Sequence, residues 1–169
     1  NPPYEDNSSG KRKALNHNLW SEFLNWSYDR LSNDGMLLYI TPTSWMSPTS
    51  KNKNIFYNNH ILYLNVNECK KHFNVGSTFS YYLIKKTNII GETEVVCEYN
   101  KKVYKSTCNL NGMEYLPNFT TNETINIIKK FMNNEFPKVS FRTSCELHNT
   151  THKNKLSDDK KEDYVYPVR

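Results

Sequence analysis

Apolar positions at helical spacing mark two segments in the first third of the chain. Between His17 and Leu31 they recur every three or four residues and predict a helix with one apolar face. The members of this face are Leu19, Trp20, Phe23, Leu24, Ser27 and Leu31. A second helix is predicted from Thr49 to Asn59, with Thr49 or Ser50 as its cap and Ile55 and Phe56 as packing residues.

Short apolar runs between and after these helices predict strands. Met36–Thr41 shows no alternation, which indicates a strand buried on both faces of a parallel sheet, and Pro42 ends it. Ile61–Val66 and Thr78–Thr87 predict two more strands, joined by a short connection or helical turn. Because their link is short, we expect them to form an antiparallel pair at the edge of the sheet.

The next segments alternate about a turn dipeptide. Glu92–Tyr99 and Lys102–Thr107 flank Asn100-Lys101, which predicts a β-hairpin. Pairing about that turn places Cys97 opposite Tyr104 rather than Cys108, which argues against a disulfide within the hairpin.

Thr120 with Glu123 resembles a capping box and predicts a helix that runs to about Asn134. The residues expected to face inward are Ile125, Ile128, Phe131 and Met132. The polar stretch from His148 to Asp163 lacks apolar periodicity and is expected to be exposed. The pattern as a whole predicts the α/β class.

The residues that suggest chemistry stand at the start of the sequence, Asn1-Pro2-Pro3-Tyr4. Each proline fixes φ and lacks an N–H group, so the Pro2 carbonyl remains available to accept a hydrogen bond from a ligand. The Asn1 amide oxygen provides a second acceptor and Tyr4 a flat ring. Two acceptors and a ring suit a planar substrate that carries an amino group.

This tetrapeptide resembles the catalytic motif of class I S-adenosylmethionine-dependent amino-methyltransferases. Leu37–Trp45 and Phe73–Ile84 resemble the segments that follow it in adenine-N6 DNA methylases, in particular the gamma-type methylases of restriction-modification systems. The resemblance covers about residues 1–110 well and the remainder weakly.

The resemblance implies the C-terminal half of a Rossmann-like methyltransferase sheet, with its fifth, sixth and antiparallel seventh strands and flanking helices. Residues 1–90 would be the catalytic half, and residues 91–169 a hairpin, a helix and the start of a target-recognition region. Asn1, Pro2, Pro3 and Tyr4 would be catalytic. Tyr4 and Phe73 would stack on the two faces of an adenine flipped out of DNA, with Phe79 as the alternative to Phe73.

Further DNA contacts are expected from two segments, a loop after the motif and the rim of the pocket. Lys11, Arg12 and Lys13 could contact phosphates from a loop after the motif, although an ordinary surface loop explains them equally well. Ligands of open α/β sheets lie beyond the carboxyl ends of strands, so Thr43, Ser44 and Trp45 are expected to rim the pocket. Trp45 could equally be a core residue.

The implied cofactor is S-adenosylmethionine, but the five glycines are scattered and form no glycine-rich turn to bind it. We therefore expect a fragment, inactive alone, whose partner is the missing N-terminal half of the same enzyme. Two alternatives stay open: a protein-glutamine or RNA amino-methyltransferase, and a non-catalytic DNA-binding fragment. The chain continues for about 80 residues past Thr87, which favours DNA over the first alternative.

Composition adds little to this. The net charge of +5 and the paired lysines are compatible with a phosphate partner. No apolar run approaches the roughly 20 residues of a membrane span, so no membrane partner is expected.

The four cysteines show no disulfide framework, so we expect reduced thiols and a cytoplasmic protein or, for a eukaryotic virus, a nuclear or viral-factory one. Cys69 with His72 and Cys145 with His148 have the spacing of zinc half-sites, but two distant pairs are weak support and no metal is predicted.

Overall fold

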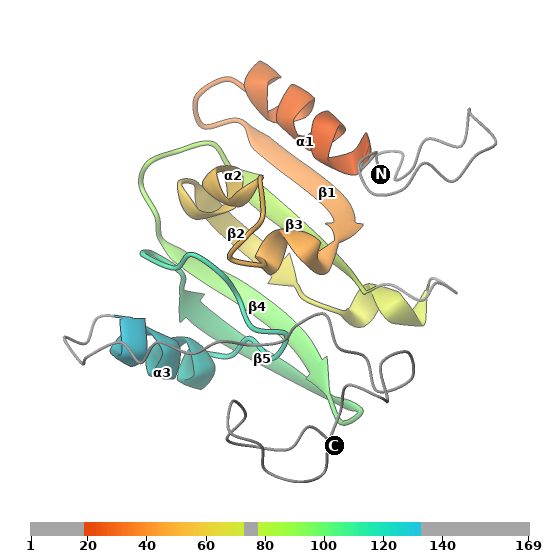
Figure 1. Cartoon of the computed structure of the whole chain (residues 1–169), viewed down its shortest axis with the longest axis vertical. Helices are drawn as coiled ribbons and strands as arrows, with labels where there is room; N and C mark the ends of the chain where they lie inside the picture. Colours follow the sequence, from red (N-terminus) through yellow and green to blue (C-terminus); the bar gives the residue numbers. More distant parts are fainter. Residues whose placement is uncertain (1–18, 73–77, 133–169) are drawn as a thin grey trace, which may run out of the picture. The chain divides into compact units, whose positions relative to one another are not determined.

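The computed structural model describes residues 19–72 and 78–132, and these form one mixed β-sheet with flanking helices. The elements in Figure 1 are α1 (Leu19–Arg30), β1 (Met36–Pro42), α2 (Lys53–Tyr57), β2 (His60–Asn65), β3 (Phe79–Lys85), β4 (Glu92–Tyr99), β5 (Lys102–Asn109) and α3 (Asn122–Met132). Two 3₁₀ helices, Thr43–Met46 and Glu68–Lys71, follow β1 and β2. The predicted α/β class is confirmed at this level.

The five strands follow the order β1-β3-β2-β4-β5. β3 is antiparallel to both β1 and β2, β2 is parallel to β4, and β4 is antiparallel to β5. It follows that β1, β2 and β4 run in the same direction and that their carboxyl ends share one edge of the sheet. β4 and β5 therefore belong to the same sheet as the strands before residue 90.

Two details of the strand prediction are wrong. The antiparallel pairing of β2 with β3 is confirmed, but β3 lies inside the sheet, between β1 and β2, rather than at its edge. The Met36–Thr41 strand pairs antiparallel with β3 and is not buried on both faces, because Met36 and Leu38 are exposed. A short apolar run does not reveal which of its faces another element covers.

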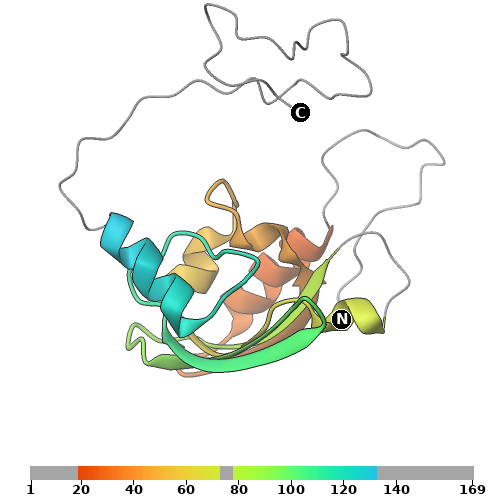
Figure 2. The same ribbon diagram turned by 90° about the horizontal axis from the view of Figure 1, so that it is seen from below.

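The α-helices of the described residues, α1, α2 and α3, lie on the same side of the sheet, as Figure 2 shows. On that side, the indole of Trp45 stacks on Phe56 with ring centroids 3.8 Å apart, and the Tyr82 ring meets both edge-on. Leu24 of α1 and Ile125 of α3 are fully buried in the same core cluster.

The helix predictions hold in position but only partly in orientation. α1 buries Trp20 and Leu24, as expected, but Phe23 is exposed. α2 buries Ile55 and Phe56, also as expected, yet it begins only after Asn52, so neither Thr49 nor Ser50 caps it.

In α3, Ile125 is buried and Ile128 packs against the core, whereas Phe131 and Met132 are exposed, contrary to the prediction. Phe131 is six residues from Ile125, which at 3.6 residues per turn places it on a different side of the helix. Met132 is on the expected side, but it is the last residue of α3.

The hairpin prediction is confirmed. Asn100 and Lys101 have φ values of 50° and 62°, the left-handed conformation that a tight two-residue hairpin turn requires. Cys97 pairs with Tyr104, and Cys69, Cys97 and Cys108 are all free and buried. Within residues 19–72 and 78–132, no helix has the length and apolar character needed to cross a membrane.

Candidate functional site

The carboxyl edge of the sheet brings together the ends of β1, β2 and β4 and the start of β3. The Thr43 backbone N–H donates a hydrogen bond to the Thr78 carbonyl at 3.0 Å, and the Thr43 hydroxyl donates to the same oxygen at 3.3 Å. The segments after β1 and before β3, far apart in the sequence, therefore meet at this edge.

Trp45 lies in the core behind this edge. Its side chain is 0 % exposed, and its indole N–H donates to the Ser80 hydroxyl at 2.9 Å. Of the two predictions for Trp45, the core role is therefore the one observed, and a direct contact with DNA would require the core to open. Its neighbour Ser44 is exposed and remains available at the rim.

Phe79, the alternative stacking residue, is the first residue of β3 and is buried. Its ring therefore does not present a free face to a base. The remaining predicted site residues lie outside the described residues. They are Asn1, Pro2, Pro3, Tyr4, Lys11, Arg12, Lys13 and Phe73.

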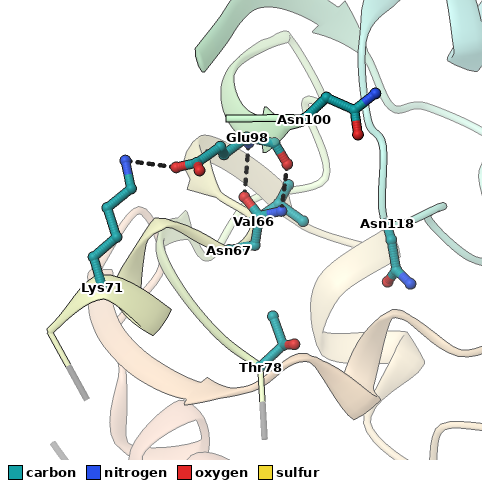
Figure 3. A pocket seen from close by; sticks show the side chains of 7 residues that line it. All are labelled: Val66, Asn67, Lys71, Thr78, Glu98, Asn100 and Asn118. Carbon is teal, nitrogen blue, oxygen red and sulfur yellow. Dashed lines mark hydrogen bonds and ion pairs between the residues drawn. The ribbon is translucent and has the colours of Figure 1, made fainter. Parts of the chain in front are cut away.

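A polar hollow of about 380 Å³ lies beyond the ends of β2 and β4 (Figure 3). Its lining residues are Val66, Asn67, Lys71, Thr78, Glu98, Asn100 and Asn118.

The Asn67 amide fixes the position of Glu98. Its oxygen accepts from the Glu98 backbone N–H and its nitrogen donates to the Glu98 carbonyl, both at 2.8 Å. The Val66 N–H donates to the Val96 carbonyl at 2.9 Å, so the contact between the two chain segments continues past the last paired residues of β2 and β4. The wall of the hollow is thus held by backbone as well as side-chain bonds.

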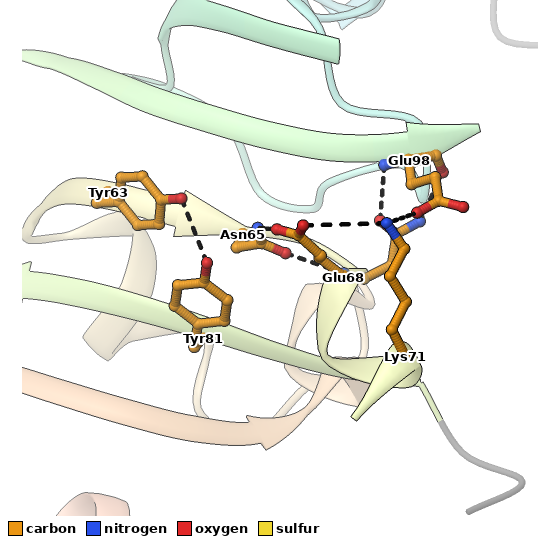
Figure 4. Close-up of polar contacts among 7 residues, drawn as sticks. Tyr63, Asn65, Glu68, Lys71, Tyr81 and Glu98 are labelled. Carbon is orange, nitrogen blue, oxygen red and sulfur yellow. Dashed lines mark hydrogen bonds and ion pairs between the residues drawn. The ribbon is translucent and has the colours of Figure 1, made fainter. Parts of the chain in front are cut away.

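One side of the hollow is closed by the ion pair of Lys71 with Glu98 (Figure 4), in which Nζ lies 2.5 Å from Oε2. The hydrogen bond to Glu98 raises the pKa of Lys71, with a smaller contribution from the charge of Glu68. Glu68 Oε1 lies 3.9 Å from Lys71 Nζ, and Glu68 also accepts from the amide nitrogen of the fully buried Asn65 at 2.7 Å. Both carboxylates therefore have fixed partners.

A tyrosine pair lies beside this network. The rings of Tyr63 and Tyr81 stack with centroids 5.7 Å apart, and their hydroxyl oxygens are 3.5 Å apart (Figure 4). The hydrogen bond with Tyr63, together with burial, raises the pKa of Tyr81 to about 12. The Tyr81 phenol is therefore neutral near pH 7, and the two tyrosines serve as hydrogen-bonding and stacking groups.

Pattern reading missed Asn67, Lys71, Glu98 and Asn118 as site residues and used Asn100 only as a turn signal. Their position in the sequence could have revealed two of them. Asn67 and Asn100 directly follow predicted strands, and ligands of such sheets bind beyond the ends of strands.

No group of three or more His, Cys, Asp or Glu side chains among the described residues is arranged to hold a metal ion. Burial raises the pKa of Cys69, which disfavours the thiolate that zinc requires. The second predicted half-site, Cys145 and His148, lies outside the described residues.

No protein-family model matches this chain, and no curated protein matches it either.

Proposed function

We propose that this chain is the catalytic C-terminal part of a DNA methyltransferase that transfers a methyl group from S-adenosylmethionine to the N6 amine of a flipped adenine. The proposal rests on the tetrapeptide Asn1–Tyr4 followed by two family-like segments that end up side by side. Leu37–Trp45 contains most of β1 and Thr78–Ile84 most of β3, and these strands are paired.

The strand arrangement supports the same proposal. β3 lies antiparallel between β1 and β2, which run in the same direction. The resemblance implies such a set, two like strands and one antiparallel strand, for the fifth, sixth and seventh strands of the methyltransferase sheet. We therefore assign β1, β2 and β3 to these strands in that order.

In this proposal the tetrapeptide prepares the amine for attack. The lone pair of an exocyclic amine is delocalised into the base ring, so the amine is a weak nucleophile. Hydrogen bonds from its two N–H groups to the Asn1 side-chain oxygen and the Pro2 carbonyl favour a tetrahedral nitrogen with a localised lone pair. The same acceptors stabilise the positive charge that develops on this nitrogen, and Tyr4 stacks on the base. After the methyl group has transferred, the nitrogen releases one of its two protons to water.

S-adenosylmethionine would supply the methyl group, but this chain contributes little to its binding. The five glycines of the sequence are scattered, and no glycine-rich turn follows a strand in residues 19–72 or 78–132. We assign cofactor binding to the other half of the enzyme, as the sequence resemblance implies. The exposed apolar side chains Met36 and Leu38 on β1 provide a surface for that half.

The test is the substitution Asn1→Ala in the complete enzyme, with Asn7→Ala as the matched control. Removing one of two acceptors that act on the developing charge should lower methyl transfer by about 100-fold or more. DNA binding and the melting temperature should stay unchanged, and Asn7→Ala should behave as the wild type. Wild-type turnover by the Asn1→Ala enzyme would refute the proposal.

A further inference from the structure

The turn of the β4–β5 hairpin carries an uncompensated positive charge. Lys101, Lys102 and Lys105 are exposed, and none of them forms an ion pair with another described residue. The carboxylate closest to them in sequence, Glu98, is already paired with Lys71. Exposed lysines of this kind attract phosphate groups and release counterions on binding.

An aromatic cluster lies on the same hairpin. Tyr99 is 53 % exposed and Tyr104 is 36 % exposed. Both rings pack on Phe119, each with its centroid 5.1 Å from that of Phe119, at interplanar angles of 45° and 86° respectively. Rings that are held in place by a neighbouring ring and remain exposed are suited to stacking on bases.

The polar hollow lies next to this cluster because neighbouring residues in the sequence belong to both. Asn100 follows Tyr99, Asn118 precedes Phe119, and both asparagines line the hollow (Figure 3). Neither amide group bonds to another described residue, whereas the oxygen and the nitrogen of the Asn67 amide are both bonded to the Glu98 backbone. An amide presents a donor and an acceptor together, the combination that pairs with the edge of a base.

We infer that the hollow and the hairpin turn form a nucleotide-binding site for unpaired DNA. Asn100 and Asn118 contact the edge of one base, Tyr99 and Tyr104 stack on neighbouring bases, and Lys101 and Lys102 hold the phosphates. The volume of about 380 Å³ is near the lower end of the roughly 300–1,000 Å³ of ligand sites, which suits a single base. This inference rests on the proposed function and adds to it the surface that holds the DNA strand.

The site is tested by fluorescence anisotropy of a labelled single-stranded DNA titrated with the full chain at several salt concentrations. The variant Lys101→Gly with Lys102→Ala should bind more weakly. The slope of the logarithm of its binding constant against the logarithm of the salt concentration should become less steep by about 1.4, or 0.7 for each lost phosphate contact. Glycine at position 101 keeps the left-handed turn conformation. The matched control is Lys129→Ala with Lys130→Ala, a second lysine pair on α3.

A second set of variants tests the bases. Tyr104→Ala should weaken binding by about 5- to 150-fold, the loss typical of one base–aromatic stack. Asn100→Gly with Asn118→Ala should also weaken it, while Phe131→Ala, which removes an aromatic ring that is 75 % exposed on α3, should not. Unchanged circular dichroism spectra verify that each variant is folded.

Three results would overturn the site: no binding by the wild type, equal losses in hairpin and α3 variants, or tighter binding of the matching RNA. Failure here is separable from failure of the proposed function. The binding assay needs neither cofactor nor methyl transfer, and the Asn1→Ala enzyme is expected to keep its affinity for DNA.

Discussion

At the scale of single residues, the indole of Trp45 ties the carboxyl edge of the sheet to the core. It stacks on Phe56 of α2 and donates to Ser80 of β3, whose hydroxyl is itself fully buried. A buried hydroxyl that loses its hydrogen-bond partner costs about 1–3 kcal/mol of stability. This is more than the bond itself contributes to the net stability of the fold.

Trp45→Phe should therefore lower the free energy of unfolding by about 1–3 kcal/mol, because phenylalanine fills most of the space but leaves Ser80 unpaired. Trp26→Phe is the control, since Trp26 is exposed on α1 and its ring contact within the described part of the chain is with Arg30, worth less than about 1 kcal/mol. Urea unfolding of both variants measures the difference. Similar losses at the two positions would contradict the core role of Trp45.

Trp45 also shows where sequence reading stops at this scale. Its position just after an apolar run and Pro42 fits a pocket rim and a core residue equally well. The packing of α2 and of β3, the latter more than 30 residues further along the chain, decides between them. Asn67 is a parallel case, because its amide has a role only through Glu98, which lies 31 residues further along the chain.

At the scale of elements, the features set by neighbouring residues were the predictable ones. The β4–β5 turn follows from Asn100-Lys101, whose backbone conformation is local, and the pairing of Cys97 with Tyr104 follows from the turn. The start of α3 was predicted within a residue or two, but Thr121 rather than Thr120 interacts with its first turn.

The contacts of Thr121 form a reciprocal cap. Its backbone N–H donates to the Thr124 hydroxyl at 2.8 Å, and its own hydroxyl accepts from the Thr124 N–H at 3.4 Å. A hydrogen bond to the backbone N–H of Glu123, and another to Thr121, lower the pKa of Glu123, which keeps a negative charge at the positive end of α3. The Thr120 hydroxyl instead donates to the Pro117 carbonyl at 2.6 Å.

Thr121→Ala should lower the free energy of unfolding by about 0.5–2 kcal/mol, while Thr121→Ser, which keeps the hydroxyl, should lose less. Amide hydrogen exchange locates the effect, because exchange at the N–H groups of Thr124 and Ile125 should become faster in Thr121→Ala. Faster exchange of these two amides in Thr120→Ala than in Thr121→Ala would show that the cap has been assigned to the wrong residue.

At the scale of the whole sheet, its two faces differ. The helices cover one face (Figure 2), whereas β1 exposes Met36 and Leu38, the latter 65 % exposed. β1 ends the strand order, so among the described residues only β3 pairs with it. An exposed apolar strand at the end of a sheet is a template for association with another chain.

The isolated chain should consequently self-associate at high concentration, and Leu38→Lys should shift it toward the monomer. Ile89→Lys is the matched control. Ile89 is also exposed and apolar and has the same size as Leu38, but it lies between β3 and β4 rather than on a strand. Sedimentation velocity measures both. If Ile89→Lys dissociates the oligomer as much as Leu38→Lys does, the contact between chains is not formed by β1.

The sequence by itself determined the positions of the helices, the strands and the hairpin turn, because helical periodicity, turn dipeptides and β-propensity act over a few neighbouring residues. It also carried the tetrapeptide Asn1–Tyr4, to which we assign the catalytic role by proposal and which lies outside the described residues. The tertiary structure alone decided that β3 lies between β1 and β2, that Trp45 is buried, and that Asn67, Lys71 and Glu98 meet at one hollow. These features depend on which distant segments pack together. The packing is determined by the free energy of the whole fold and not by the residues of any single segment.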